Sequence, residues 1–503
     1  KEPIVFYVGR GVPEFLRPYV KAGIEQWQPA FESAGFKNAI IGKYAPSEEE
    51  DPNWDAEDAT ISTIRWLPAD IKNAFGPHVH DPRTGEILEA DVRMYHNVMT
   101  LVRDWYFVQA AACDERAQKL PMPNDLMGEL VQFVVAHEVG HSLGLPHNFK
   151  ASASYTVEQL RDPEWTKANG TAPSIMDYAR FNYVAQPGDG AALLPAIGPY
   201  DHYSIEWGYR QFDDDEKAGL EALAKKQIDE PMYRFGGGRG DPTTQTEDLT
   251  GDAVEATRLG IENLKRIAGF MVEATCEEGE DYGLLENMYD QLWGQWNREI
   301  GHVISYVGGI EEINLWYGDA DKRYFEVSPE RQRAAVEFLI ENALGEPEAA
   351  MVNEDITLRL SATGVADRVA GAQARVLRSL MSAGRIDRMS EVASRTDDAY
   401  APSEMLDDLR EAVFGEGMVA ISSLTLRERN LQRAYVDILI DAMNGTSATS
   451  DFPALARRQL QMVRSRIRIG RADDVTQAHL SELRSRILDA LDPHGRAESS
   501  GGS

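Results

Sequence analysis

Hydrophobic and polar residues change their spacing along the chain near residue 236. In the first part, short apolar runs at residues 4–8, 39–44 and 61–66 indicate β-strands. Apolar positions three and four apart over residues 13–31 indicate an amphipathic helix between the first two strands. We therefore expect strands and helices to alternate here, as in a domain that packs a sheet against helices.

Two further extended runs and a long helix follow. Residues 75–80 and 87–95 are strand-like, and the turn-forming sequence Asp-Pro-Arg-Thr-Gly at residues 81–85 joins them. The pattern from about residue 125 to 143 predicts a helix. A loop-rich region comes next, and we expect a short helix to begin near Asp201 with that residue as its N-cap.

Farther along, the pattern becomes helix after helix. Leu, Ile, Val and Met recur at three- and four-residue spacing, which is typical of amphipathic helices. The predicted helices cover residues 252–275, 282–306, 329–345, 364–382, 402–414, 425–444, 452–467 and 473–491. One predicted hairpin, with strands at residues 313–317 and 324–327, interrupts them.

Glycine separates the two patterns. Three consecutive glycines at residues 236–238 resist both helix and strand, so we place a linker at residues 236–250. The expected fold class is α+β, with a twisted mixed sheet in a domain at residues 1–235 and a mostly helical region at residues 251–495. Residues 496–503 are rich in Ser and Gly and are typical of a disordered tail.

Composition excludes some classes of function. At 503 residues, two or more domains are the default expectation. The 82 acidic and 51 basic side chains give a formal charge of −31. This charge argues against a nucleic-acid partner, because phosphate backbones attract clustered Lys and Arg. Two cysteines, Cys113 and Cys276, are too few for a disulfide framework, and a single bridge between them stays open.

Neither a membrane span nor a signal peptide is evident in the sequence. Every apolar run is shorter than a bilayer-spanning helix requires. Lys1 leads directly into the strand-like run at residues 4–8. We expect such an abrupt start in a mature or excised fragment, so the missing signal says little about localisation.

The chemistry of the chain is concentrated at residues 137–147, which read His-Glu-x-x-His-x-x-Gly-x-x-His. Residues four apart share a helix face, so His137 and His141 can direct imidazole nitrogens to one ion. Gly144 lets the chain leave the helix through a conformation that other residues resist, which turns His147 toward the same ion. Three neutral imidazoles with one open position are typical of a catalytic zinc site.

Glu138 is the predicted general base. It lies beside the histidine face and can reach a water molecule on the ion, whose pKa zinc lowers from about 15.7 to about 7. The alternative is an ordinary helix that carries these residues for packing, since a bare His-Glu-x-x-His recurs by chance. The third histidine and the glycine at the required spacing count against that alternative, because only ten histidines occur in the whole chain.

This extended motif resembles that of the metzincins, zinc peptidases in which a methionine turn follows downstream. The sequence Ser-Ile-Met-Asp-Tyr at residues 174–178 fits that turn. The resemblance implies that Met176 forms a hydrophobic floor beneath the zinc. In astacins and serralysins a tyrosine at the position of Tyr178 approaches the metal and stabilises the tetrahedral intermediate. The alternative for Tyr178 is simple packing against the following loop.

The likeness to metzincins extends through the N-terminal part. Residues 3–8 and 20–27 are similar to the opening strand and long helix of a metzincin domain. Residues 73–77 look like the edge strand along which such enzymes align an extended substrate by strand addition. His78 and His80 either line that cleft or are solvated residues of the edge strand.

In more detail, the chain is similar to the large bacterial zinc-dependent metalloproteases of the met-zincin group over about residues 1–345. The resemblance implies an endopeptidase with one catalytic Zn²⁺, an extended protein or peptide substrate, and a secreted or periplasmic location. One departure is Asn148-Phe149 after the third histidine, where the best-known families carry Glu, Ser, Asp or Pro. Their sub-family specificity therefore cannot be transferred to this chain.

Two other functions stay open at this stage. One is a binding or scaffold protein on a catalytically silent peptidase fold. The intact Glu138 counts against it, because a degenerate site is expected to lose its base first. The other is a zinc amidase that acts on a cell-wall or other non-protein polymer, since the metal activates water whichever amide is presented.

A calcium ion is a further candidate. Asp241, Glu247, Asp248 and Asp252 follow the glycines, and their carboxylates are ligands that Ca²⁺ accepts. Their spacing does not match an EF-hand loop. An acidic helix start, which the helix dipole favours, is the preferred interpretation of these residues.

Overall fold

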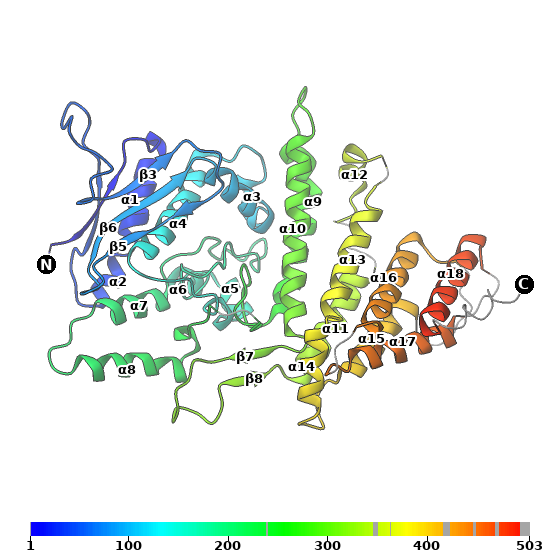
Figure 1. Ribbon diagram of the computed structural model, residues 1–503. Coiled ribbons are helices and arrows are strands. Elements are labelled where there is room, and N and C mark those ends of the chain that lie inside the picture. The colour runs from blue at the N-terminus through cyan, green and yellow to red at the C-terminus, as the bar shows by residue number, and fades with distance from the viewer. Residues whose placement is uncertain are drawn as a thin grey trace, which may run out of the picture. The chain divides into compact units, whose positions relative to one another are not determined.

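The computed structural model describes most of the chain, namely residues 2–237, 240–345, 351–362, 364–415, 423–445, 449–467 and 472–492. Figure 1 traces the chain from its sheet-containing N-terminal part to its helical C-terminal part, so the predicted α+β class with a helical C-terminal region is confirmed. The predicted tail at residues 496–503 and Gly238 of the glycine run lie outside the described residues.

The chain divides into two compact units. One consists of Lys1–Trp296 with Glu312–Tyr324, and the other of Asn297–Glu311 with Phe325–Ser503. The units thus divide at a later position than the glycine-rich segment, and a linker at residues 236–250 stays a prediction.

A mixed sheet forms the centre of the first unit. Its strands follow the order β2 (Ile40–Tyr44), β1 (Ile4–Val8), β3 (Ser62–Leu67), β6 (Ile87–Tyr95) and β4 (Ala74–Phe75). The first four run parallel, whereas β4 and β5 (His78–His80) both run antiparallel to β6. The register continues unchanged from Ala74–Met94 to His78–Ala90. β4 and β5 therefore occupy one edge of β6, in the region where the sequence predicted an edge strand.

Helices α1 (Arg17–Glu25) and α4 (Asn124–Ser142) pack together against this sheet (Figure 1). The single helix predicted over residues 13–31 is instead a 3-10 turn, α1 and the short helix α2 (Gln28–Ser33). Pro18 and Pro29 each lie in the first turn of their helix. Proline lacks an amide hydrogen and suits only that first turn, so each one starts a new helix.

Several helices were not predicted from the sequence. They are α3 (Val98–Ala110), α5 (Val157–Arg161), α6 (Pro163–Asn169), α8 (Glu216–Asp229), α12 (Glu354–Leu360) and α14 (Ala383–Ala393). In α3 every residue from Tyr106 to Ala110 is buried, so its apolar positions surround the helix and no amphipathic period appears. The predicted cap Asp201 also lies elsewhere, within the first turn of α7 (Pro199–Tyr209), whose cap is Gly198.

The second unit is mostly helical where the structure describes it, and one hairpin contributes residues to both units. Its helices from α13 onward include α13 (Ala366–Leu380), α15 (Pro402–Phe414), α16 (Leu426–Met443), α17 (Phe452–Arg466) and α18 (Asp474–Leu491). α16 packs against α13, α17 and α18, with Tyr435 and Leu439 in the core. The hairpin pairs β7 (Ile310–Glu312) with β8 (Tyr324–Glu326), so its first strand lies before the predicted residues 313–317.

Two long helices, α9 (Ala253–Thr275) and α10 (Gly283–Tyr306), lie between the sheet domain and the later helices in sequence, and both were predicted. α10 begins in the first unit and ends in the second. In the described part of the chain, no helix is both long and apolar enough to cross a membrane. Cys113 and Cys276 are free thiols.

Candidate active site

Helix α4 carries the first two histidines of the motif. Most of its residues from Leu126 to Ser142 are buried, which explains the nearly continuous apolar pattern of this segment. Trp27, at the start of α2, donates its indole N–H to the Ala136 carbonyl at 2.9 Å. The helix backbone is thereby held beside the sheet one residue before His137.

The end of α4 is a Schellman motif. The Gly144 amide donates to the His141 carbonyl at 2.9 Å, and the Leu145 amide donates to the Gly140 carbonyl at 3.1 Å. Gly144 has φ +92°, a left-handed conformation that residues with a Cβ adopt at a cost. This turn reverses the chain and brings His147 back beside the helix, as the sequence predicted.

The three imidazoles converge. The His147 Nε2 atom lies 3.0 Å from His141 Nε2 and 3.2 Å from His137 Nε2. In the described chain, these residues form the one group of three His, Cys, Asp or Glu side chains close enough to hold a common ion. Three imidazole nitrogens aimed at one point, with no carboxylate among them, fit a zinc ion.

Backbone carbonyls fix the orientation of two of these rings. His137 Nδ1 donates to the Ile175 carbonyl at 2.7 Å, and His141 Nδ1 donates to the Leu145 carbonyl at 2.8 Å. Because a carbonyl only accepts, each Nδ1 carries the proton and each Nε2 keeps its lone pair for a metal. Burial lowers the pKa of all three rings, that of His147 to about 4, so they are neutral near pH 7.

Glu138 is buried beside the histidines. Burial raises the pKa of its carboxyl to about 7, and the backbone amide of Gly76 acts in the opposite direction. Gly76 follows β4 directly, so the edge strand leads to the carboxyl group. His78 Nδ1 lies 3.1 Å from the His141 carbonyl oxygen, and this contact joins the first residue of β5 to the end of α4.

The predicted methionine turn packs beneath the histidines. Met176 is buried, and a Cβ added at Gly140 would lie 2.3 Å from its sulfur and 2.7 Å from the Trp27 ring. The turn is held by Asp201 of α7, whose carboxylate accepts from the Ser174 hydroxyl at 2.7 Å and from the Ile175 amide at 2.8 Å. Met176 and its turn therefore lie against the histidine face of α4.

Tyr178 lies beside the imidazoles and is held by residues that the sequence did not point to. Its ring centroid is 4.3 Å from that of His147. The Arg180 guanidinium lies 4.6 Å over the Tyr178 ring and 3.3 Å over the Trp105 ring. Glu247 forms an ion pair with Arg180 at 3.4 Å, and its amide donates to the Tyr178 carbonyl at 2.7 Å.

Asn148, the residue that departs from the familiar families, is a structural link. It is fully buried, and its backbone amide donates to the Met176 carbonyl at 3.2 Å. Its side chain donates to the Arg234 carbonyl at 3.0 Å and accepts from the Gly236 amide at 3.0 Å. Asn148 therefore joins the methionine turn to residues 234–236, immediately after the third histidine.

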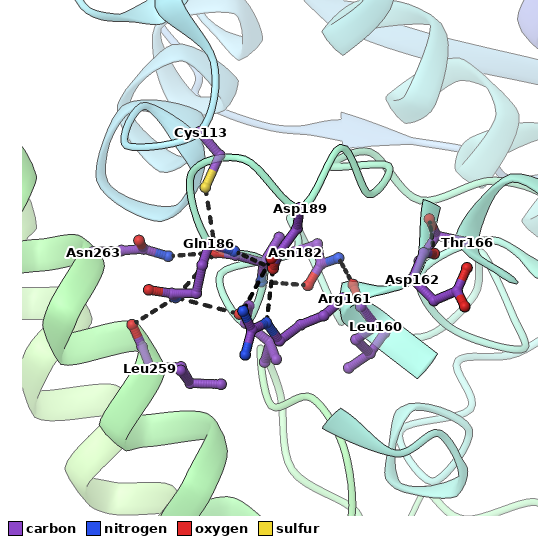
Figure 2. Close-up of polar contacts among 12 residues, drawn as sticks. Cys113, Leu160, Arg161, Asp162, Thr166, Asn182, Gln186, Asp189, Leu259 and Asn263 are labelled. Carbon is purple, nitrogen blue, oxygen red and sulfur yellow. Dashed lines mark hydrogen bonds and ion pairs between the residues drawn. The ribbon is translucent and has the colours of Figure 1, made fainter. Parts of the chain in front are cut away.

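A polar cluster holds the loop that follows Tyr178 (Figure 2). Asp189 forms an ion pair with Arg161 of α5 at 2.7 Å. Asn182 donates to the Leu160 carbonyl at 2.7 Å, and Gln186 donates to the Leu259 carbonyl of α9 at 3.2 Å. These contacts fix the loop against α5 and α9 without placing a charged group among the histidines.

The predicted calcium carboxylates do not gather into one group. Glu247 pairs with Arg180, and Asp241 pairs with Lys150 at 2.9 Å. Asp252 caps α9 by accepting from the Glu255 amide. Asp248 is buried. The structure gives no support to calcium at this cluster of four.

The family is decided by comparison with known proteins. The family model described as Met-zincin matches residues 119–419, which is more than half of the chain. The chain belongs to the Met-zincin family. Neither a curated protein nor a solved structure matches it. The matched residues of this Met-zincin include the three histidines and the methionine turn, and the family together with the histidine geometry points to zinc at this site.

Proposed function

We propose that this Met-zincin is a zinc-dependent endopeptidase that hydrolyses peptide bonds in extended protein or peptide substrates. The observation that carries the proposal is the convergence of three Nε2 atoms beside the buried carboxyl group of Glu138. His137, His141 and His147 are the proposed zinc ligands. When bound there, zinc polarises an amide carbonyl and acidifies water.

Glu138 is the proposed general base and acid. A group with a pKa near 7 takes a proton from the attacking water and returns it to the leaving amine with little free-energy cost in either direction. In the metal-bound protein, the positive charge favours the ionised carboxylate, which is the form that accepts the proton. Tyr178 is proposed to donate its hydroxyl hydrogen to the oxyanion of the tetrahedral intermediate, and the position of its ring beside that of His147 supports this role.

The substrate is proposed to bind along β4 and β5. The outer edge of β4 and β5 offers backbone groups for strand addition, and β4 leads through Gly76 to Glu138. Phe75 and Val79 are 52% and 54% exposed, so apolar side chains accompany the edge. His78 contacts the end of α4, so we propose that it lines the cleft, whereas His80 is exposed.

The test compares Glu138→Gln with the wild-type protein for zinc content and for cleavage of casein. Both proteins should hold one zinc per chain, and cleavage by the variant should fall at least about 1000-fold, since the glutamine amide cannot accept a proton. Substantial cleavage by Glu138→Gln would remove the proposed base.

If neither protein cleaves casein although both hold zinc, the proposed peptidase activity is contradicted. Parallel digestion of a cell-wall polymer then separates a zinc amidase from a silent scaffold. A bacterial source and a secreted or periplasmic location remain expectations of the family resemblance.

A further inference from the structure

We propose that Asp177, Asp248 and Ser152 form a second cation site, one with oxygen ligands that takes a hard divalent ion of the Ca²⁺ class. Asp177 directly follows Met176 of the methionine turn, and the site shares no residue with the proposed zinc site. It is independent of the endopeptidase reaction.

The first observation is a pair of buried carboxyl groups, each with one oxygen atom that lacks a hydrogen-bond partner in the described chain. Asp177 is 1% exposed and Asp248 is 3% exposed. The Oδ1 atom of each accepts no hydrogen bond in the described chain. A charged oxygen that is buried without a hydrogen-bond partner costs several kcal/mol. We therefore expect each of these oxygens to bind a partner that the protein itself does not supply.

Ser152 lies between these two carboxyl groups. Its amide donates to Asp177 Oδ2 at 2.7 Å, and its carbonyl accepts from the Thr250 amide at 3.1 Å. Burial raises the pKa of both Asp177 and Asp248, and the neighbouring Ser152 hydroxyl acts on each of them in the opposite direction. This hydroxyl oxygen is itself buried and forms no well-aligned hydrogen bond with any described residue.

The electrostatic surroundings call for positive charge. Burial raises the pKa of both carboxyl groups, and neighbouring carboxylates add to it: Asp201 raises the pKa of Asp177, while Asp177 and Asp241 raise that of Asp248. The nearby Lys150 amine lies 2.9 Å from Asp241. Asp201, which is also buried, shows the contrast, because it accepts from the Ser174 hydroxyl and from the amides of two residues.

The donor set selects the class of ion. Two carboxylate oxygens and a hydroxyl, with no imidazole or thiolate, suit Ca²⁺ and Mg²⁺ better than zinc. Ca²⁺ accepts irregular geometry and completes its shell with carbonyl oxygens and water, whereas Mg²⁺ demands a near-ideal octahedron. Three segments distant in sequence meet here, so Ca²⁺ is the better match.

A cation at this position would join the methionine turn to two other segments. Asp177 belongs to the turn, Ser152 begins a 3-10 helix (Ser152–Ser154) after the third histidine, and Asp248 precedes α9. Binding would therefore stabilise the folded first unit without any change in the histidines.

The test uses the full chain, stripped of metals with EDTA and returned to one equivalent of zinc. Calcium chloride is then titrated by calorimetry, and melting is followed with and without calcium. We expect one Ca²⁺ per chain and a higher melting temperature. Asp248→Asn should abolish both effects. Asp252→Asn should keep both, because Asp252 is an exposed helix cap and Asn caps helices as well as Asp does.

If Asp248→Asn fails to fold, Ser152→Ala serves as a milder variant. It should weaken calcium binding at least about tenfold. Two results would overturn the proposal. In the first, the wild-type protein binds no calcium and Asp248→Asn is more stable than the wild type at neutral pH. That result indicates that the two carboxyl groups share a proton. The other is calcium binding that survives in both Asp248→Asn and Ser152→Ala.

Discussion

At the scale of single residues, burial shifts the two kinds of ionisable group at the site in opposite directions. It keeps the imidazoles neutral by lowering their pKa values, and it keeps the Glu138 carboxyl protonated to higher pH by raising its pKa. Both shifts disfavour charge in the metal-free protein. A divalent cation at the histidines would lower the pKa of Glu138 again. The stability of the metal-free protein and that of the metal-bound protein should therefore depend differently on pH.

The first prediction concerns the stability of the metal-free protein. The folded-state pKa of Glu138 is raised from 4.5 to about 7, so the folded chain binds more protons than the unfolded chain between these values. The stability that this group contributes is present below pH 4.5 and is lost as pH rises to about 7. From pH 4.5 to 8, wild type should lose about 3 kcal/mol more than Glu138→Gln.

Urea unfolding of both metal-free proteins at the two pH values measures this difference. The histidine contributions are common to both proteins and cancel in the comparison. An identical pH dependence in wild type and Glu138→Gln would show that the carboxyl group is not buried as described.

The second prediction concerns Arg180, which we infer to be a positioning residue for Tyr178. Arg180→Lys keeps the charge near Glu247 but loses the flat guanidinium between the Trp105 and Tyr178 rings. We expect kcat to fall about 10-fold with KM nearly unchanged, and Tyr178→Phe to cost about 100-fold. Arg161→Lys, in an ion pair away from the imidazoles, is the matched control and should leave kcat unchanged.

The double variant separates positioning from an independent effect. If Arg180 acts only through Tyr178, then Arg180→Lys should cost nothing further once Tyr178 is Phe. Fully additive losses would contradict the inference, while leaving the endopeptidase proposal untouched.

At the scale of elements, the contact between α4 and the methionine turn leaves no room for a side chain at Gly140. The third prediction is that Gly140→Ala destabilises the protein by about 2–3 kcal/mol, because Met176 and Trp27 must shift to admit a methyl group. Zinc affinity should fall with it, since the same turn holds His137 through the Ile175 carbonyl.

Gly144→Ala is the control at the other end of the same motif. No atom lies within 4 Å of a Cβ added there, so the cost is only that of the left-handed backbone, about 1 kcal/mol. Denaturant unfolding and zinc titration of both variants test the difference. Equal losses would show that the methionine does not press on the helix.

What the sequence could predict at this scale follows from the range of the interactions. The helix that carries His137 and His141, the glycine exit and the parallel strands depend on local spacing, and the structure places them where they were predicted. The contacts of Arg180 with Trp105 and Glu247 join distant segments, and no periodicity reports such contacts. The roles of the site residues themselves stay predictions until activity is measured.

At the scale of the whole molecule, two compact units share one helix, α10, and the Met-zincin match extends over parts of both. The fourth prediction is that calorimetry resolves two transitions and that removal of zinc lowers only one. With free zinc at about a thousand times its dissociation constant, its loss costs about 4 kcal/mol.

Variants assign each transition to a unit. Gly140→Ala should lower the zinc-sensitive transition. Leu377→Ala, which removes about 2–5 kcal/mol of buried packing from the second unit, should lower the other one. Equal shifts of both transitions on zinc removal would show that the units unfold together.

The links made by Asn148 and Arg180 have a consequence for the order in which a ribosome delivers the chain. All three histidines, Met176 and Tyr178 emerge from the ribosome before Arg234. The side-chain partners of Asn148 lie at residues 234–236, and the ion-pair partner of Arg180 is Glu247, so these contacts form later. A nascent chain therefore contains all three proposed zinc ligands before the contacts of Asn148 and Arg180 can form. We therefore expect the site to be completed only after Glu247 has been synthesised.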